Sequence, residues 1–346
     1  MTKTKTMTKN MTKNMTKTMA KTMAKNMART GATNPLATNP LSTNPLSTNP
    51  MSGDGRLKIA LQKSGRLSEM SVGLLEKAGI SLTKSRDQLL CRAHNFPLDV
   101  FLVRDDDIPA FLATNVCQVG ILGQNALLEK QALFAEKYAA LEEVMALGFG
   151  RCRLSIAAPT SFEYRSVDSL NGKTIATSYR GLLEAYLRDK GVEADIVTME
   201  GAVEVAPRTH LADAICDLVS TGNTLISNGL QEQDVILQSQ AVLIKNNNMD
   251  SELQEIYEKI LSRIRAVLRA DNSRYIMLNS PIDSLDAIKA VLPGSASPTV
   301  MPLQGREDMV AVHAVCEEEV FWTTMEELQR NGANSILVVP IEKMLD

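Results

Sequence analysis

The chain of 346 residues exceeds one typical domain, so two or three globular units are expected. Aromatic residues make up only 4% of the chain, so aliphatic side chains must build the cores. Residues 1–50 carry a net charge of +8 and the rest carries −11, which leaves the body without the basic face that duplex nucleic acid requires. No apolar run approaches the roughly 20 residues that span a bilayer, so neither nucleic acid nor a membrane is an expected partner.

The cysteines and histidines do not form a recognisable metal or nucleophilic site. The five cysteines show no Cys-x-x-Cys or Cys/His cluster, which argues against structural zinc and favours reduced, buried thiols in a cytoplasmic protein. The three histidines, His94, His210 and His313, are scattered, and none pairs with a nearby Ser or Cys in a way that suggests a catalytic triad. Neither a P-loop nor a dinucleotide-binding glycine motif occurs.

The first fifty residues are a repeat. A four-residue period (MTKN, MTKT, MAKT) changes at residue 33 to a five-residue period (TNPLA, TNPLS) with a proline in every unit. Neither period matches a helix or a strand face, so we predict a disordered, low-complexity segment over 1–50. A translated DNA repeat with the functional start at Met51 is the favoured interpretation, and an organellar transit peptide is the alternative.

The body begins with an α/β unit, expected over 51–150. An apolar strand at 56–62 is followed by the turn KSGR and a helix, then by strands near 87–92 and 98–103. A helix over about 105–114 follows Asp105–Asp107, whose charges suit its N-terminus as caps. A strand at 116–123 leads into another helix, and this alternation predicts a parallel sheet covered on both faces.

A second α/β unit is expected over 151–238. Its strands are predicted at 151–159, 172–179, 194–199 and from 213, with a helix after residue 179 and a turn and helix over 201–212. The segment 239–272 is predicted to return to the first unit as a strand at 239–246 and a helix at 251–270. Two lobes joined by crossing strands create a cleft, the usual ligand site of such folds.

The helix at 251–270 has the clearest pattern in the chain. Apolar residues recur at three- and four-residue spacing from Leu253 to Leu268, and Ser251 with Gln254 is predicted to form a capping box. The remainder, 273–346, reads strand, helix, strand, strand, helix, strand. That order is the ferredoxin-like pattern and predicts a separate C-terminal domain.

Two segments have the composition of phosphate-binding loops. In the first, an apolar strand containing Asp213 and Asp217 ends in the loop 220–224, of sequence STGNT. Successive backbone N–H groups of such a loop converge on phosphate oxygens, hydroxyls donate further bonds, and an Asp accepts from ribose hydroxyls. The second is KSGR, where Lys63 and Arg66 flank Ser-Gly between a strand and a helix, which suits a polyphosphate. Ordinary turns are the alternative for both segments.

The segments together resemble the ATP phosphoribosyltransferase family of histidine biosynthesis, in its long, self-regulated form. The similar stretches run from about residue 56 to the end. They are LKIALQKSGRL, RDDDIP, VGILGQN, GFGRCRLSIAAP, GKTIATSY, GAVEVAPRTHLADAICDLVSTGNTL, SRYIMLNSP, LPGSASPTVMPL and NSILVVPIEKM. The resemblance implies a two-lobed, periplasmic-binding-protein-like α/β catalytic core and a C-terminal ferredoxin-like regulatory domain. One departure is His210, where the family usually has Gly.

By this resemblance, ATP and 5-phosphoribosyl 1-diphosphate form phosphoribosyl-ATP and diphosphate with Mg²⁺, whose protein ligands are not identified. The 5-phosphate is expected on Ser220, Thr221, Gly222, Asn223 and Thr224. The ribose hydroxyls are expected on Asp217, with Asp213 as a second acceptor, and the nucleotide and diphosphate on Lys63, Arg66 and Tyr179. Glu204 is either a general base or a structural anchor.

The family also implies regulation and assembly. L-histidine is expected to bind the C-terminal domain at Asn279, Ser297, Thr299 and Ser335 as a feedback inhibitor, and dimers and hexamers of the chain are expected. Two other functions remain as alternatives. One is a non-catalytic, two-lobed small-molecule binding protein, and the other is a phosphoribosyltransferase with a different acceptor.

Overall fold

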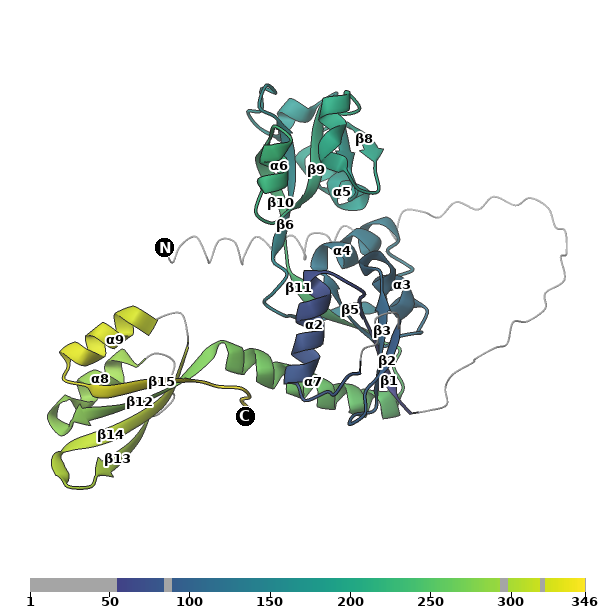
Figure 1. Cartoon of the computed structure of the whole chain (residues 1–346). Helices are drawn as coiled ribbons and strands as arrows, with labels where there is room; N and C mark the ends of the chain where they lie inside the picture. Colours follow the sequence, from purple (N-terminus) through teal and green to yellow (C-terminus); the bar gives the residue numbers. More distant parts are fainter. Residues whose placement is uncertain (1–54, 84–88, 293–297, 318–320, 346) are drawn as a thin grey trace. The chain divides into compact units, whose positions relative to one another are not determined.

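A computed structural model describes residues 55–83, 89–292, 298–317 and 321–345. The repeat over 1–50, predicted to be disordered, and the proposed start at Met51 lie outside these ranges. Three β-sheets organise the described residues, and each carries its own helices (Figure 1).

The first sheet has six strands, in the order β2-β3-β1-β4-β11-β5. Strands β1, β3 and β4 are parallel, whereas β2, β11 and β5 pair in antiparallel fashion. The prediction of a purely parallel sheet is therefore wrong, because β2 turns directly back into β3 and β11 re-enters the sheet from the second lobe. The strands are β1 (Leu57–Gln62), β2 (Leu90–Arg92), β3 (Leu98–Val103), β4 (Val119–Gly123), β5 (Leu141–Ala146) and β11 (Ala241–Asn246).

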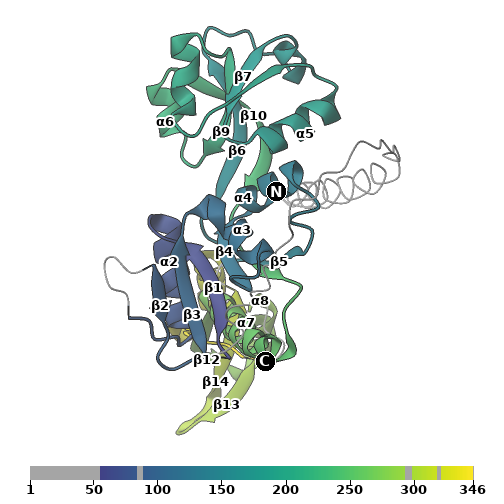
Figure 2. The same cartoon turned by 90° about the vertical axis from the view of Figure 1, so that its right-hand side faces the viewer.

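Helices cover both faces of this sheet. Helices α2 (Arg66–Lys77) and α7 (Ser251–Asp271) pack on the face that carries Ile59, while α3 (Ile108–Ala113) and α4 (Gln124–Leu133) pack on the face that carries Ala60 (Figure 2). Strand β1 therefore carries apolar side chains on both faces, with Lys58 and Gln62 as its polar residues.

Two helix starts differ from the prediction. Helix α7 is capped by Asp250, whose carboxylate accepts from the backbone N–H of Leu253 at 2.9 Å, so the capping box at Ser251 is wrong. Asp250 lies one residue before the helix, where its carboxylate can reach the free backbone N–H groups of the first turn. The acidic run forms a separate 3-10 turn, η1 (Asp105–Asp107), and makes no side-chain capping hydrogen bond to α3.

The second sheet has five strands, in the order β10-β6-β9-β7-β8. Helix α5 (Arg180–Lys190) and the turn η2 (Val167–Leu170) contribute to the core on one face, and the 3-10 helix η3 (Val203–Thr209) and the short α6 (Asn223–Ser227) to the core on the other. The segment predicted as a turn and helix over 201–212 is thus a 3-10 helix, which contains Pro207. The strands are β6 (Cys152–Pro159), β7 (Thr174–Thr177), β8 (Asp195–Thr198), β9 (Ala214–Val219) and β10 (Leu230–Ser239).

The two sheets repeat one topology. The order β3-β1-β4-β11-β5 in the first corresponds to β8-β7-β9-β6-β10 in the second. In each sheet the first three strands are parallel, and each of the last two is antiparallel to the strand before it. The chain crosses from the first lobe to the second after β5 and returns between β10 and β11. This is the two-lobed, periplasmic-binding-protein-like core. Strand β10 was not predicted, because its first half, 231–234, is polar and shows no apolar alternation.

The third sheet confirms the ferredoxin-like pattern. Its order β13-β14-β12-β15 is antiparallel throughout, and α8 (Leu285–Val291) and α9 (Phe321–Arg330) contribute to its core. The turn η4 (Ile282–Ser284) leads into α8. The strands are β12 (Ser273–Pro281), β13 (Thr299–Leu303), β14 (Arg306–Glu317) and β15 (Asn334–Pro340).

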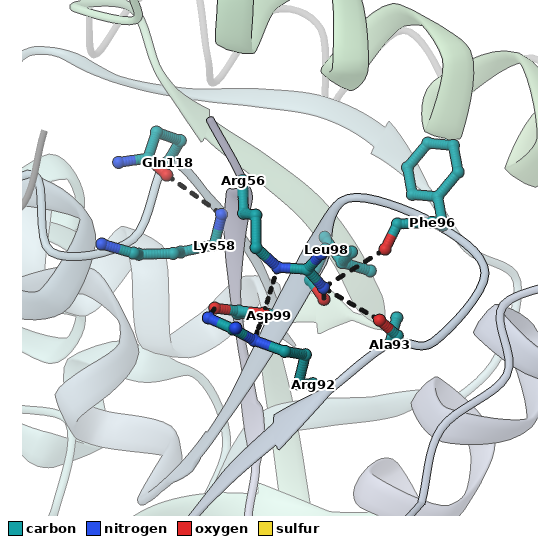
Figure 3. Close-up of polar contacts among 8 residues, drawn as sticks. All are labelled: Arg56, Lys58, Arg92, Ala93, Phe96, Leu98, Asp99 and Gln118. Carbon is teal, nitrogen blue, oxygen red and sulfur yellow. Dashed lines mark hydrogen bonds and ion pairs between the residues drawn. The ribbon is translucent and has the colours of Figure 1, made fainter. Parts of the chain in front are cut away.

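A partly buried arginine ties the amino ends of β1 and β3 together (Figure 3). The Arg56 guanidinium donates to Asp99 Oδ1 at 2.7 Å and to the backbone carbonyls of Leu98 at 2.7 Å, Ala93 at 2.9 Å and Phe96 at 3.3 Å. Asp99 is 3% exposed, so its charge depends on such partners. The network lies at the amino ends of the parallel strands, opposite their carboxyl ends.

All five cysteines are free thiols; Cys152 is partly exposed and the other four are buried. Within the described ranges, no helix combines the length and apolar character that a membrane span requires.

Candidate functional site

The loop 220–224 follows the carboxyl end of β9 in the second lobe. Gly222 adopts φ +83°, a left-handed conformation that favours glycine, whereas a Cβ there would meet only Val219, at 3.9 Å. The backbone angle, and not a lack of space, therefore calls for glycine. The guanidinium of Arg153 donates to the carbonyl of Ser220 at 3.1 Å and anchors the start of the loop.

The amide groups of this loop are unoccupied donors. No described residue accepts a hydrogen bond from the N–H groups of Thr221, Gly222 or Asn223, and Gly222, at the N-terminal cap of α6, offers no side-chain cap. Ser220, Thr221 and Thr224 add exposed hydroxyls. Consecutive free amides with hydroxyls form a concave set of donors suited to a phosphate.

Asp217 and Glu204 form a pair of neighbouring carboxylates beside this loop. Asp217 lies on the face of β9 where η3, which carries Glu204, packs. Burial raises the pKa of the Asp217 carboxyl, the N–H of Leu218 lowers it, and the charge of Glu204 raises it further. A half-buried acid of this kind gains from an outside donor such as a sugar hydroxyl or a cation.

Asp213 does not belong with Asp217. It precedes the first residue of β9, and its carboxylate accepts from the backbone N–H of Thr174 at 2.9 Å. A strand of this length spans about 20 Å, so Asp213 lies at the opposite end from the loop 220–224. Its position corrects the prediction that both acids face the sugar: Asp213 holds the start of β7 in register instead.

Lys63 and Arg66 also follow the carboxyl end of a parallel strand, β1 of the first lobe. Both are exposed, and they flank the turn between the carboxyl end of β1 and the start of α2. The backbone N–H of Lys63 donates to the carbonyl of Val103 at 2.7 Å, which ties the turn to the end of β3. Gly65 precedes α2 as its N-terminal cap and offers no side-chain cap, so the helix N-terminus and the two cations present positive charge on one side.

Tyr179 connects the two lobes. It follows β7 in the second lobe, and its hydroxyl oxygen accepts from the side-chain amide of Asn125 in the first, at 3.1 Å. Burial raises the pKa of Tyr179, and the charges of Asp106 and Asp217 raise it further. The structure therefore brings Tyr179, Asp217 and the acidic turn η1 within electrostatic reach of one another.

Asp105 is a site residue that sequence reasoning missed, because its position before a helix was interpreted as capping. Its Oδ1 atom is buried and finds no hydrogen-bond partner among the described residues. Burial raises the pKa of Asp105 to about 6; the charge of Asp106 adds to this and the N–H of Gly123 opposes it. A buried oxygen without a partner, close to Tyr179, marks a place where a ligand completes the site.

Replacing Asp105 with Asn is expected to stabilise the metal-free protein at pH 7.5 by about 1–3 kcal/mol. The folded pKa lies above the unfolded value, so wild type loses stability as the pH rises from near 4 to above 6 and the variant does not. Urea unfolding midpoints in the presence of a chelator measure the difference, which should shrink toward zero at pH 4.5. An equal difference at both pH values would show that ionisation of the Asp105 carboxyl is not the cause.

The residues predicted to bind histidine lie on the third sheet, but not all of them are adjacent. Asn279 on β12 pairs with Asn334, the neighbour of Ser335 on β15. Thr299 lies on β13, two strands from β12, so about 10 Å separates it laterally from Asn279. Ser297 lies outside the described residues.

His210 occupies a position that suits glycine. It ends η3 with φ +56°, a left-handed conformation that costs a residue with a Cβ about 1 kcal/mol. The turn is nevertheless closed, because the N–H of His210 donates to the carbonyl of Pro207 at 3.2 Å. His210 therefore places a strained backbone conformation at the end of η3.

Comparisons with known proteins agree with these features. A family model for ATP phosphoribosyltransferase (HisG) matches residues 104–266, and a model for the HisG C-terminal domain matches residues 270–343. The ATP phosphoribosyltransferase of Maricaulis maris (strain MCS10) is 49% identical over 291 residues, which cover 84% of this chain and 99% of that protein.

Two solved structures are also similar to this chain. The ATP phosphoribosyl transferase (HisG:HisZ) complex from Thermotoga maritima matches with 27% identity and a TM-score of 0.53, over 62% of this chain and 98% of that chain. The periplasmic VFT2 domain of Bordetella pertussis BvgS matches with 15% identity and a TM-score of 0.40, over 60% of this chain and 87% of that one. With both family models and a close relative matched over most of its length, this chain belongs to the ATP phosphoribosyltransferase family, in the form that carries the additional C-terminal domain.

Proposed function

We propose that the protein transfers the phosphoribosyl group of 5-phosphoribosyl 1-diphosphate to ATP, the first step of histidine synthesis. In this reaction N1 of adenine forms a bond to C1 of the ribose as the bond from C1 to the diphosphate oxygen breaks. The diphosphate leaves with the electron pair. The observation that carries the proposal is the set of free loop amides at 221–223 beside Asp217, in a chain of this family.

The proposed roles follow from the chemistry of each group. The loop amides and the hydroxyls of Ser220, Thr221 and Thr224 hold the 5-phosphate. The carboxylates of Asp217 and Glu204 accept from the ribose hydroxyls and favour the positive charge that develops on the ring. No covalent nucleophile is needed, because the protein acts by positioning the two substrates and by charge.

The leaving diphosphate and the nucleotide are assigned to the first lobe and to Tyr179. Lys63, Arg66 and the N-terminus of α2 offer positive charge where the diphosphate accumulates negative charge. The Tyr179 hydroxyl lies close to both lobes through its bond to Asn125 and is assigned to the nucleotide.

Mg²⁺ suits this site as a partner of the phosphates. No three His, Cys, Asp or Glu side chains converge among the described residues, so a bound Mg²⁺ takes most of its oxygens from substrate and water, as is usual for this ion. Asp105, with its unpaired buried oxygen, and its neighbour Asp106 are the residues that would hold it. When bound, Mg²⁺ neutralises charge on the diphosphate.

An absorbance assay tests the activity. Purified protein mixed with ATP, phosphoribosyl diphosphate and Mg²⁺ should produce an increase near 290 nm that requires all three, and GTP in place of ATP should give none. Absence of any increase with folded protein would overturn the proposal. Calorimetry that showed amino acid binding without binding of phosphoribosyl diphosphate would favour the alternative, a non-catalytic binding protein. An increase with another acceptor would point to a different phosphoribosyltransferase.

We further propose feedback inhibition by L-histidine through the C-terminal domain, in a cytoplasmic homo-oligomer of dimers and hexamers. The sheet of this domain leaves Met301, Leu337 and Val339 between 41% and 57% exposed, which favours contact with another copy. L-histidine should lower the rate of the wild type but not of Asn279→Ala. Light scattering with and without histidine measures the assembly, and a monomer in both conditions would contradict it.

A further inference from the structure

Asn125 is a buried amide whose polar groups are all used. It lies in the first turn of α4 and is 4% exposed. Its Oδ1 accepts from the Ser239 hydroxyl at 2.8 Å, its Nδ2 donates to the Tyr179 oxygen at 3.1 Å, and its backbone N–H donates to Ser239 Oγ at 3.1 Å. A Cβ on Gly123 would meet Asn125 Oδ1 at 2.5 Å, so the glycine leaves the space that this side chain occupies.

The order of donors and acceptors in this network has a fixed direction. Because Ser239 Oγ accepts from the Asn125 N–H, its own proton is free to go to Asn125 Oδ1. The Cys152 thiol is also within hydrogen-bonding reach of Ser239; burial raises the pKa of this thiol, and the contact with Ser239 lowers it. With its oxygen occupied, Asn125 must turn its NH₂ toward Tyr179. The tyrosine oxygen is then an acceptor within the protein, and its own proton is left for an outside acceptor.

The same helix holds the backbone next to Tyr179. Glu129, one turn after Asn125 on α4, is 6% exposed, and its carboxylate accepts from the N–H groups of Gly181 and Leu182 at 2.8 Å each. These are the first-turn amides of α5, which starts directly after Tyr179. A Cβ on Gly181 would meet the Leu133 side chain at 2.9 Å, so the two helices are in close contact. Tyr179 is thus fixed at both its hydroxyl and its backbone.

We propose that Asn125 is a positioning residue that turns the Tyr179 hydroxyl into a hydrogen-bond donor toward an acceptor oxygen of the bound nucleotide. Ser239 sets the orientation of the Asn125 amide, and Glu129 holds the helix that follows the tyrosine. The inference rests on the proposed function, in which Tyr179 contacts ATP.

Asn125→Asp reverses the hydrogen bond with little change in size. A carboxylate at this position accepts the proton of Tyr179 and withholds it from the substrate. We expect the KM for ATP to rise about 5- to 10-fold, the worth of one hydrogen bond, with kcat changed less. Tyr179→Phe should raise the KM for ATP by a similar factor. Adding Asn125→Asp to Tyr179→Phe should raise this KM little further. Gln131→Ala removes a side-chain hydrogen bond from the same helix to the Leu141 carbonyl, and it should leave the KM for ATP unchanged.

The results separate positioning from a structural role. If Asn125→Asp raises the KM for ATP by as much in the Tyr179→Phe background as in the wild type, Asn125 does not act through the tyrosine. The inference is then overturned. Asn125→Leu is a second variant, and thermal unfolding checks that each protein is folded. If the wild type binds ATP without turnover, the proposed function fails. The Kd for ATP of the wild type, the two single variants and the double variant then decides the inference. If the wild type does not bind ATP, both fail.

Discussion

Asp217→Asn is expected to lower kcat/KM by about 100- to 1,000-fold while the protein stays folded. The change keeps the shape of the side chain and removes the negative charge that favours the transition state of the ribose ring, an interaction of the kind whose loss costs this much. The absorbance assay near 290 nm measures the rate, and circular dichroism checks the fold.

Asp213→Asn is a matched control on the same strand. It makes the same chemical change at the other end of β9, where the amide oxygen can still accept from the N–H of Thr174. We expect its rate to stay within about 3-fold of wild type, or about 0.65 kcal/mol. Equal losses of kcat/KM in both variants would mean that Asp217→Asn acts by disturbing β9 and not by removing a charge from the site.

Thr221→Val tests the loop itself. The variant keeps the volume and the backbone amide but removes one hydroxyl donor, so the KM for phosphoribosyl diphosphate should rise by about 10-fold. Full activity in both Asp217→Asn and Thr221→Val would refute the placement of the sugar phosphate at 220–224.

Arg56→Met is expected to destabilise the protein by about 3–5 kcal/mol, which is the usual cost of leaving a buried charge with reduced compensation. Three backbone carbonyls lose their donor, and Asp99 keeps the two longer contacts to Arg92, at 3.3 Å each. The melting temperature should fall by roughly 5–10 °C. Turnover at 25 °C should stay near the wild-type value, because the network lies at the amino ends of the strands.

Lys77→Met provides the comparison for this effect. Lys77 pairs with Asp271 at 2.9 Å, but the two side chains are 58% and 46% exposed, so the loss should be under about 1 kcal/mol. Replacing Asp99 with Leu in the Arg56→Met background should recover part of the stability, since it removes the buried charge. Equal melting temperatures for Arg56→Met and Lys77→Met would show that the buried network contributes no more than a surface pair.

Local patterns were enough to predict most of the elements. The apolar strand before KSGR, the stripe from Leu253 to Leu268 and the βαββαβ order of the last domain all match the structure. The loop 220–224 was also singled out, because a strand that ends in Ser, Thr, Gly and Asn has the composition of a phosphate-binding loop, a composition that it shares with ordinary turns. Each of these features depends on residues close in sequence, whose spacing reflects which face is buried.

Contacts between distant segments could not be predicted in this way. The strand directions at the sheet edges, the separation of Asp213 from Asp217, the unpaired oxygen of Asp105 and the link from Asn125 to Tyr179 all depend on partners far away in the chain. Patterns local in the chain predicted most of the elements and carried the family resemblance. Only the tertiary structure decided which polar groups meet, because a hydrogen bond or a pKa depends on the atoms that folding places nearby.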